Sequence, residues 1–207
     1  MSETTSKRRI SLPLILAGGV SSLVLALGMS PTFSAFTASI QSGANLASAG
    51  TLTMEETSGS VTCRSTDGAN GLSGNSATCA TINKYGGTGA LLTPGGAANV
   101  TTVTIANTGT VAATSFSLTP GACAQSALGT PVGNATDLCT KLHVKITTGT
   151  TTVYEGSASA LTTPVALTPL ANGASASYTF AVSLDSSADN TYQGLQASQP
   201  LTWTFQS

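Results

Sequence analysis

The sequence predicts an all-β protein, a single antiparallel β-sandwich of the jelly-roll or immunoglobulin-like kind preceded by a helical signal peptide. Three observations predict it. Short stretches of alternating apolar and polar residues recur along the chain. Turns rich in Gly, Pro and Asn separate these stretches. A basic and then apolar segment opens the chain. We divide the 207 residues into a signal peptide (1–35), a leading segment (36–50) and a sandwich domain (51–207).

The first residues have the layout of a secretory signal peptide. Residues 7–9 are Lys-Arg-Arg, residues 10–27 form an apolar run, and residues 28–36 return to small and turn-forming types. Pro13 and a Gly-Gly pair interrupt the run, so the sequence predicts no stable membrane span after processing, with a retained anchor as the alternative. We therefore expect export through the Sec machinery, removal of the signal by a signal peptidase, and a secreted, extracellular protein; the resemblance given below narrows this location to an extracellular matrix or the cell surface.

Two positions compete for signal cleavage. The small-x-small rule of ordinary signal peptidase favours cleavage after Gly28. Cleavage after Ala35 would instead leave bulky Phe33 where a small side chain is normal. We place the cut between Ala35 and Phe36 on the resemblance given below, and keep Gly28 as the alternative.

Five stretches in the domain alternate with period two, which is typical of half-buried strands. Their one-sided sets are Val103 and Ile105; Ala112, Thr114, Phe116 and Leu118; Leu142, Val144 and Ile146; Tyr178, Phe180, Val182 and Leu184; and Leu201, Trp203 and Phe205. Residues 51–55 and 151–155 are shorter candidates. The Asn-Thr-Gly at 107–109 reads as a hairpin turn between two strands. A short helical turn is predicted within residues 187–192.

Four cysteines lie in the domain, and an even number in an exported chain predicts disulfides with three possible connectivities. We favour Cys63–Cys79 and Cys123–Cys139, because each pair is separated by 16 positions and the residues between read as loops. Each bond would contribute about 3 kcal/mol in the chain-entropy account. Zinc is the weaker reading, since the chain has no Cys-x-x-Cys pair and only one histidine.

Charge excludes one class of partner. The part after residue 35 carries four basic and seven acidic side chains, a formal charge of −3. It has no basic patch for a phosphate backbone, so we do not expect nucleic acid as a partner. Solubility depends on Ser, Thr, Asn and Gln, and a weakly charged surface permits self-association.

The sequence offers little for catalysis, and we expect no enzymatic activity and no cofactor. His143 is the only histidine and lies on the outward side of its strand, beside Lys141 and Lys145. The chain has neither a His-Glu-x-x-His motif for zinc nor a Gly-x-Ser-x-Gly elbow for a serine nucleophile. His143 is therefore read as a solvent-facing side chain.

Two acidic groups could bind a cation but have simpler readings. Glu55 and Glu56 read as solvated charges at the end of a strand. Asp185, Asp189 and Asn190 could supply oxygen ligands to calcium, but their spacing does not match an EF-hand loop, so a polar turn is favoured. We expect no metal site.

Aromatic residues near the C-terminus allow a carbohydrate platform made of Tyr192, Trp203 and Phe205. The alternation of the last strand instead favours core packing for Trp203 and Phe205. Tyr192, which precedes Gln-Gly, is read as a residue that fixes a turn.

Three ordered segments carry a family resemblance. They are Ser34-Ala-Phe-Thr-Ala-Ser followed by Ala49-Gly-Thr-Leu-Thr-Met; Leu92-Thr-Pro-Gly followed by Val103-Thr-Ile-Ala-Asn-Thr-Gly-Thr; and Asn190-Thr-Tyr-Gln-Gly followed by Leu201-Thr-Trp-Thr-Phe. In this order the chain resembles the TasA/camelysin group of bacterial secreted matrix proteins, whose atypical signal peptide is cut by a dedicated signal peptidase. The four cysteines and the insertion between residues 63 and 79 depart from that pattern.

The resemblance implies a structural function. The protein would assemble into extracellular fibres or a surface matrix, with further copies of itself as head-to-tail partners and other matrix or surface proteins as additional ones. The donor strand would be residues Phe36–Ala49 of the leading segment, whose apolar positions are Phe36, Ala38, Ile40, Ala44 and Leu46. It would pair with an open sheet edge of the next subunit.

Two other functions stay open. A monomeric surface adhesin would recognise a glycan or a host protein through long loops. A metalloprotease has to be considered because camelysin is described as one, although the zinc motif is absent from this chain.

Overall fold

The structure, a computed structural model, describes residues 40, 45–130 and 132–207. The chain divides into two compact units, Met1–Ala47 and Ser48–Ser207. Of the first unit, residues 40 and 45–47 alone are described, so the signal peptide and both candidate cleavage positions lie outside the described residues. All of the described strands belong to the second unit.

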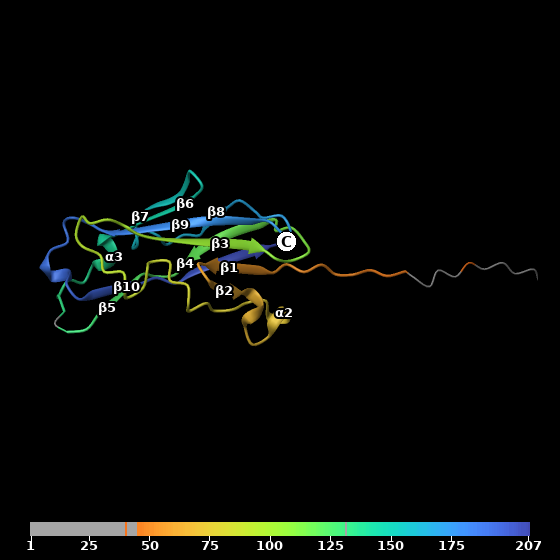
Figure 1. Ribbon diagram of the computed structural model, residues 1–207, viewed down its shortest axis with the longest axis horizontal. Coiled ribbons are helices and arrows are strands. Elements are labelled where there is room, and N and C mark those ends of the chain that lie inside the picture. Colours follow the sequence, from red (N-terminus) through yellow and green to blue (C-terminus); the bar gives the residue numbers. More distant parts are fainter. Residues whose placement is uncertain (1–39, 41–44, 131) are drawn as a thin grey trace, which may run out of the picture. The chain divides into compact units, whose positions relative to one another are not determined.

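The larger sheet has six antiparallel strands in the order β2-β1-β3-β9-β6-β7. They are β1 (Met54–Ser58), β2 (Val61–Arg64), β3 (Asn99–Asn107), β6 (Leu142–Thr148), β7 (Thr151–Ser157) and β9 (Ser175–Leu184). The strand content confirms the prediction of an all-β domain (Figure 1).

The opposing layer consists of two short ladders laid end to end. One has the order β11-β4-β8, from β4 (Ser115–Pro120), β8 (Val165–Leu167) and β11 (Leu201–Gln206). The other pairs β10 (Leu195–Ser198) with β5 (Ala124–Ala127). The Gly121 amide joins them by donating to the Pro200 carbonyl (2.7 Å). Short helical turns are η1 (Ser65–Asp67), α2 (Gly71–Gly74), α3 (Leu138–Lys141) and η2 (Asn190–Tyr192), and η2 lies within the predicted helical turn.

The inward side chains of the two layers form one core, which confirms the sandwich. The alternating sets of β3, β6 and β9 point into it as predicted, and Val103, Ile105, Val144, Ile146 and Phe180 are fully buried. Rings from opposite sheets meet there. The centroid of the Tyr178 ring lies 5.1 Å from that of Trp203 and 5.9 Å from that of Phe116.

Three boundary predictions were wrong. The strand expected at residues 51–55 is β1 at Met54–Ser58, because residues 51 and 53 use their carbonyls to bond residues 108–111 instead. Ala112 and Thr114 precede β4 and are exposed, so its one-sided set begins at Phe116. Residues 124–127, expected in a loop, form β5, because Gln-Ser-Ala can pair with β10 although it has no apolar alternation.

The predicted hairpin at Asn107 is instead a corner between layers. β3 pairs with β1 and β9, whereas β4 belongs to the opposite layer. The buried Asn107 side chain donates to the carbonyls of Val111 (2.9 Å) and Leu170 (3.1 Å) and accepts from the Gly109 amide (3.0 Å). A Cβ at Gly109 would collide with the main-chain carbonyl of Thr51, so only glycine fits this crossing.

Both disulfides join the cysteines that the spacing favoured, Cys63 with Cys79 and Cys123 with Cys139. The first ties β2 to the chain that follows α2, and the second ties the residue before β5 to α3. Two disulfides are compatible with an exported protein.

Candidate functional site

The opposing layer has an open edge. β11 pairs with β4 and β10 pairs with β5, and among the described residues no strand pairs with the other side of either. Since the two ladders are continuous, residues 195–205 present one long edge. An unpaired strand edge is a template for another strand, and proteins normally cover or disrupt it.

The register fixes which main-chain groups face this edge. In an antiparallel ladder the N–H and C=O of one residue point to the same side, and successive residues alternate. The Pro200 carbonyl accepts from Gly121 on the β4 side. Leu201, Trp203 and Phe205 therefore direct their main-chain groups away from β4, to the open side.

A groove of about 570 Å³ lies along β11. One wall is β11 itself with Pro200, and the other is the start of β1 with residues 52–53, the end of β2, the start of η1 and residues 75–79. Leu201, Trp203 and Phe205 all line it, as does the Cys63–Cys79 disulfide. The groove thus offers apolar surface immediately beside unpaired main-chain groups.

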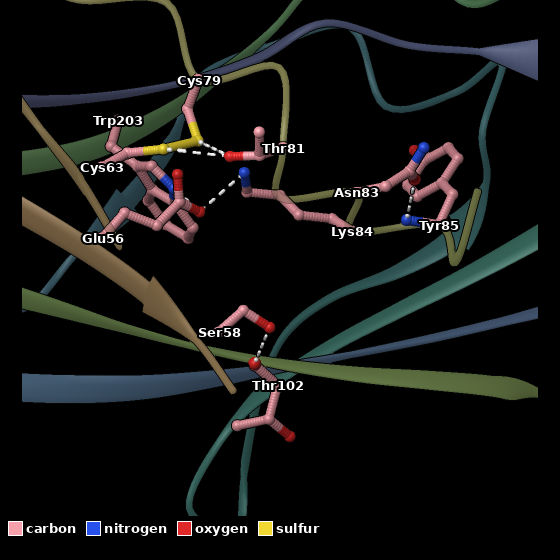
Figure 2. A network of polar contacts seen from close by, with 10 residues as sticks. All are labelled: Glu56, Ser58, Cys63, Cys79, Thr81, Asn83, Lys84, Tyr85, Thr102 and Trp203. Carbon is pink, nitrogen blue, oxygen red and sulfur yellow. Dashed lines mark hydrogen bonds and ion pairs between the residues drawn. A yellow bond between two sulfur atoms is a disulfide. The ribbon is translucent and has the colours of Figure 1, made fainter. Parts of the chain in front are cut away.

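A buried ion pair lines this groove, between Glu56 of β1 and Lys84 of the loop before β3. The Lys84 Nζ lies 2.7 Å from Glu56 Oε1, and each side chain is only 9% exposed. The indole Nε1 of Trp203 donates to the same oxygen (3.0 Å), and the Lys84 Nζ lies 5.9 Å from the Trp203 ring centroid. Figure 2 shows the three side chains converging beneath the disulfide.

Both acids were predicted to be solvated charges. This prediction was wrong for Glu56, which is buried, whereas Glu55 is partly exposed. Neighbouring strand residues point to opposite faces, so two consecutive acids cannot both face solvent. Glu55 faces outward and pairs with Arg64 at 2.9 Å. Glu56 faces the core opposite buried Ile105 and needs a buried partner. The alternation of side chains along a strand is enough to predict that one of the two acids points inward. It does not identify Lys84 as the partner of Glu56, because Lys84 lies in a loop without periodicity.

The aromatic residues of β11 pack as core residues, and they also line the groove. The Trp203 ring contacts those of Phe116 (5.7 Å) and Phe180 (6.2 Å), and the Phe205 ring lies 4.7 Å from that of Phe116. The Trp203 and Phe205 side chains are partly buried rather than exposed as a flat platform.

Tyr192 fixes a turn, as its sequence context indicated. Its hydroxyl donates to Asp137 Oδ1 (2.6 Å), which lowers the pKa of that carboxyl and raises the pKa of Tyr192 to about 12. Asp189 accepts from the amide and hydroxyl of Thr191 (2.9 and 2.6 Å), and these bonds lower its pKa. The same cause, bonds from Ser187, lowers the pKa of Asp185. These acids serve turn geometry.

A second cavity, of about 450 Å³, is lined in part by residues of β10, β5 and α3. These elements lie together at one end of the domain (Figure 1). Its lining mixes leucines, among them Leu92 and Leu195, with Tyr85, Tyr192 and the polar Gln196. Burial raises the pKa of the Tyr85 hydroxyl, which donates to Gln199 Oε1 (2.7 Å).

The remaining candidate residues are not brought together. His143 is exposed, and its Nε2 lies 3.9 Å from Glu155 on the outer face of the larger sheet. In the part of the chain that the structure describes, no three His, Cys, Asp or Glu side chains form a group able to hold a metal. Of the donor positions, Ile40 and Leu46 are exposed and belong to no strand, whereas Phe36, Ala38 and Ala44 lie outside the described residues.

Comparison with known proteins assigns the chain to no family. No protein-family model matches the chain, and no curated protein matches it. The likeness to the TasA/camelysin group therefore stays a prediction from the three segments. Within residues 40, 45–130 and 132–207, no helix has the length and apolarity needed to cross a membrane.

Proposed function

We propose that this protein is a secreted structural subunit that assembles into extracellular fibres or a surface matrix by strand addition. The leading segment Phe36–Ala49 of one copy pairs with the open β10–β11 edge of the next. The observation that carries the proposal is this edge, where unpaired main-chain groups lie beside an apolar groove. Apolar donor side chains bind in the groove, and main-chain bonds extend the sheet.

Growth follows from the geometry of such a contact. Donor and acceptor are different surfaces, so the contact is head-to-tail and repeats without closing unless the rotation between subunits forms a ring. The low charge of the exported chain, −3 over 172 residues, leaves little repulsion between copies. Matrix retention then needs no anchor besides assembly, and other matrix or surface proteins could bind the same edge.

Point variants of the exported chain test this proposal. Ile40→Asp places a charge on the donor face, whereas Ser39→Asp places it on the opposite face of the same segment and serves as the control. The exported chain and Ser39→Asp should elute as high-mass polymer and form filaments under negative stain, and Ile40→Asp should elute as monomer. Monomeric behaviour of the unaltered chain at high concentration would exclude fibre formation.

A surface adhesin is the second candidate, and the 450 Å³ cavity favours it. A cavity that mixes tyrosine rings with amide side chains suits a small glycan. If the exported chain stays monomeric, binding of a soluble oligosaccharide that Gln196→Ala abolishes would support this function instead.

A further inference from the structure

Residues 79–85, which we name the cover segment, lie over the open side of the sandwich without forming a strand. Their burial nevertheless alternates as in a strand. Ile82 and Lys84 are buried, whereas Thr81 and Asn83 are exposed. Ile82 belongs to the hydrophobic core. The cover segment thus supplies inward side chains as an inserted strand would.

Its attachment to β10 and β11 involves side chains only. The Tyr85 hydroxyl donates to Gln199, and Lys84 lies over the Trp203 ring. The main-chain bonds of the described residues around it are local, such as that from the Gly86 amide to the Asn83 carbonyl (3.2 Å). The main-chain groups of the open edge therefore gain nothing from the cover segment.

The cover segment is attached more firmly to the other wall of the groove, which includes β1 and β2. The Cys63–Cys79 disulfide joins the start of the cover segment to β2, and the ion pair joins Lys84 to β1. Directly after Tyr85, Gly86 and Gly87 have φ values of 93° and 74°, which suit glycine. These glycines allow a change of backbone direction. Once Lys84 is released from Glu56, the chain can move away from β11 while the Cys63–Cys79 disulfide keeps it tied to β2.

We infer that the cover segment is a placeholder, which occupies part of the acceptor groove in the free subunit and is displaced from β11 by the leading segment of a second copy. This inference rests on the proposed function. An incoming strand supplies inward apolar side chains, as the cover segment does, and also main-chain hydrogen bonds, which the cover segment does not make. The incoming strand therefore gains more binding free energy at this edge. The cover segment also protects a long open edge from non-specific pairing before assembly.

Trypsin reports this displacement, because the Lys84 side chain is only 9% exposed in the free subunit. The test uses exported Ile40→Asp protein, which should accept but not donate, with a synthetic peptide of residues 36–49. Binding is read from the fluorescence of Trp203, the only tryptophan of the chain. Cleavage after Lys84 is read from the masses of the fragments. We expect peptide binding to raise the rate of this cleavage at least tenfold, with little change elsewhere.

Each outcome decides a different claim. If the peptide binds and Lys84 stays protected, the placeholder inference is wrong and strand addition stands. If the peptide does not bind, the proposed function fails and the inference with it. A second variant supports the first measurement: Tyr85→Phe removes the bond to Gln199 and should tighten peptide binding about two- to tenfold, the effect of one hydrogen bond. Tyr154→Phe, whose hydroxyl bonds the Ser157 carbonyl of its own strand, should leave it unchanged.

Discussion

The buried ion pair gives the sharpest stability prediction. Lys84→Met would leave the Glu56 carboxylate without its cation at a site that is 9% exposed. Breaking a buried pair by removing one partner costs about 3–5 kcal/mol, because the remaining charge is desolvated without compensation. For a domain of this size, about 2–4 °C of melting temperature corresponds to each kcal/mol, so we expect a fall of roughly 6–20 °C.

A matched pair of variants isolates the cause. Glu56→Gln combined with Lys84→Met removes both charges and keeps an oxygen for the Trp203 indole, so the double variant should lose only about 1–2 kcal/mol, for an incompletely bonded amide. Lys145→Met breaks a pair with Glu155 whose side chains are 41% and 46% exposed, and should cost at most about 1 kcal/mol.

The assays are thermal unfolding, for the melting temperature, and urea unfolding, for the free energy of unfolding; both use the disulfide-bonded protein in the Ile40→Asp background and follow Trp203 fluorescence. Equal losses for Lys84→Met and Lys145→Met would refute the buried-charge reasoning. So would a double variant as unstable as Lys84→Met alone.

Three further predictions follow from other contacts. Asn107→Asp should destabilise the domain by at least about 3 kcal/mol in urea unfolding, because a carboxylate would face two carbonyls that now accept from the amide; a loss below 1 kcal/mol would contradict the corner's role. Replacing Cys123 and Cys139 together by alanine should cost about 3 kcal/mol, measured in the same way, and a negligible loss would show that this bond is dispensable. The depressed pKa of the Asp137 carboxyl contributes stability above its unfolded pKa, and that stability is lost as the pH falls through its folded pKa. Asp137→Asn should therefore weaken the loss of stability at acid pH, measured as unfolding midpoints over a pH series. An unchanged loss at acid pH would exclude the bond from Tyr192 as its cause.

Alternation predicted most strands because the domain has one core and each strand has one face in it. Tyr178, Phe180 and Val182 are spaced by two and are all buried. The predicted disulfides followed from equal spacing. Alternation does not predict which of the two layers each strand joins, since an Asn-Thr-Gly sequence suits both a hairpin within one sheet and a corner between layers. At Asn107 the difference lies in a bond to the carbonyl of Leu170, 63 residues away in the chain, which local sequence does not encode.

The candidate site was predictable only in part. The sequence indicated an inward Trp203 and an apolar leading segment. It did not indicate the open edge, because which strands lack a neighbour depends on the order of all of them. Nor did it indicate the Glu56–Lys84 pair, since a single lysine in a Gly-rich stretch has no pattern. Such a residue reads as solvated until its partner in space is known.

Hydrogen–deuterium exchange along β11, resolved to single residues, is the most direct measurement of strand addition. We predict that the amides of Leu201, Trp203 and Phe205 exchange readily in the Ile40→Asp monomer and become protected in polymer of the unaltered exported chain. The amides of Thr202, Thr204 and Gln206, which face β4, should be protected in both. Polymer in which the three outward amides exchange as fast as in the monomer would contradict strand addition at this edge.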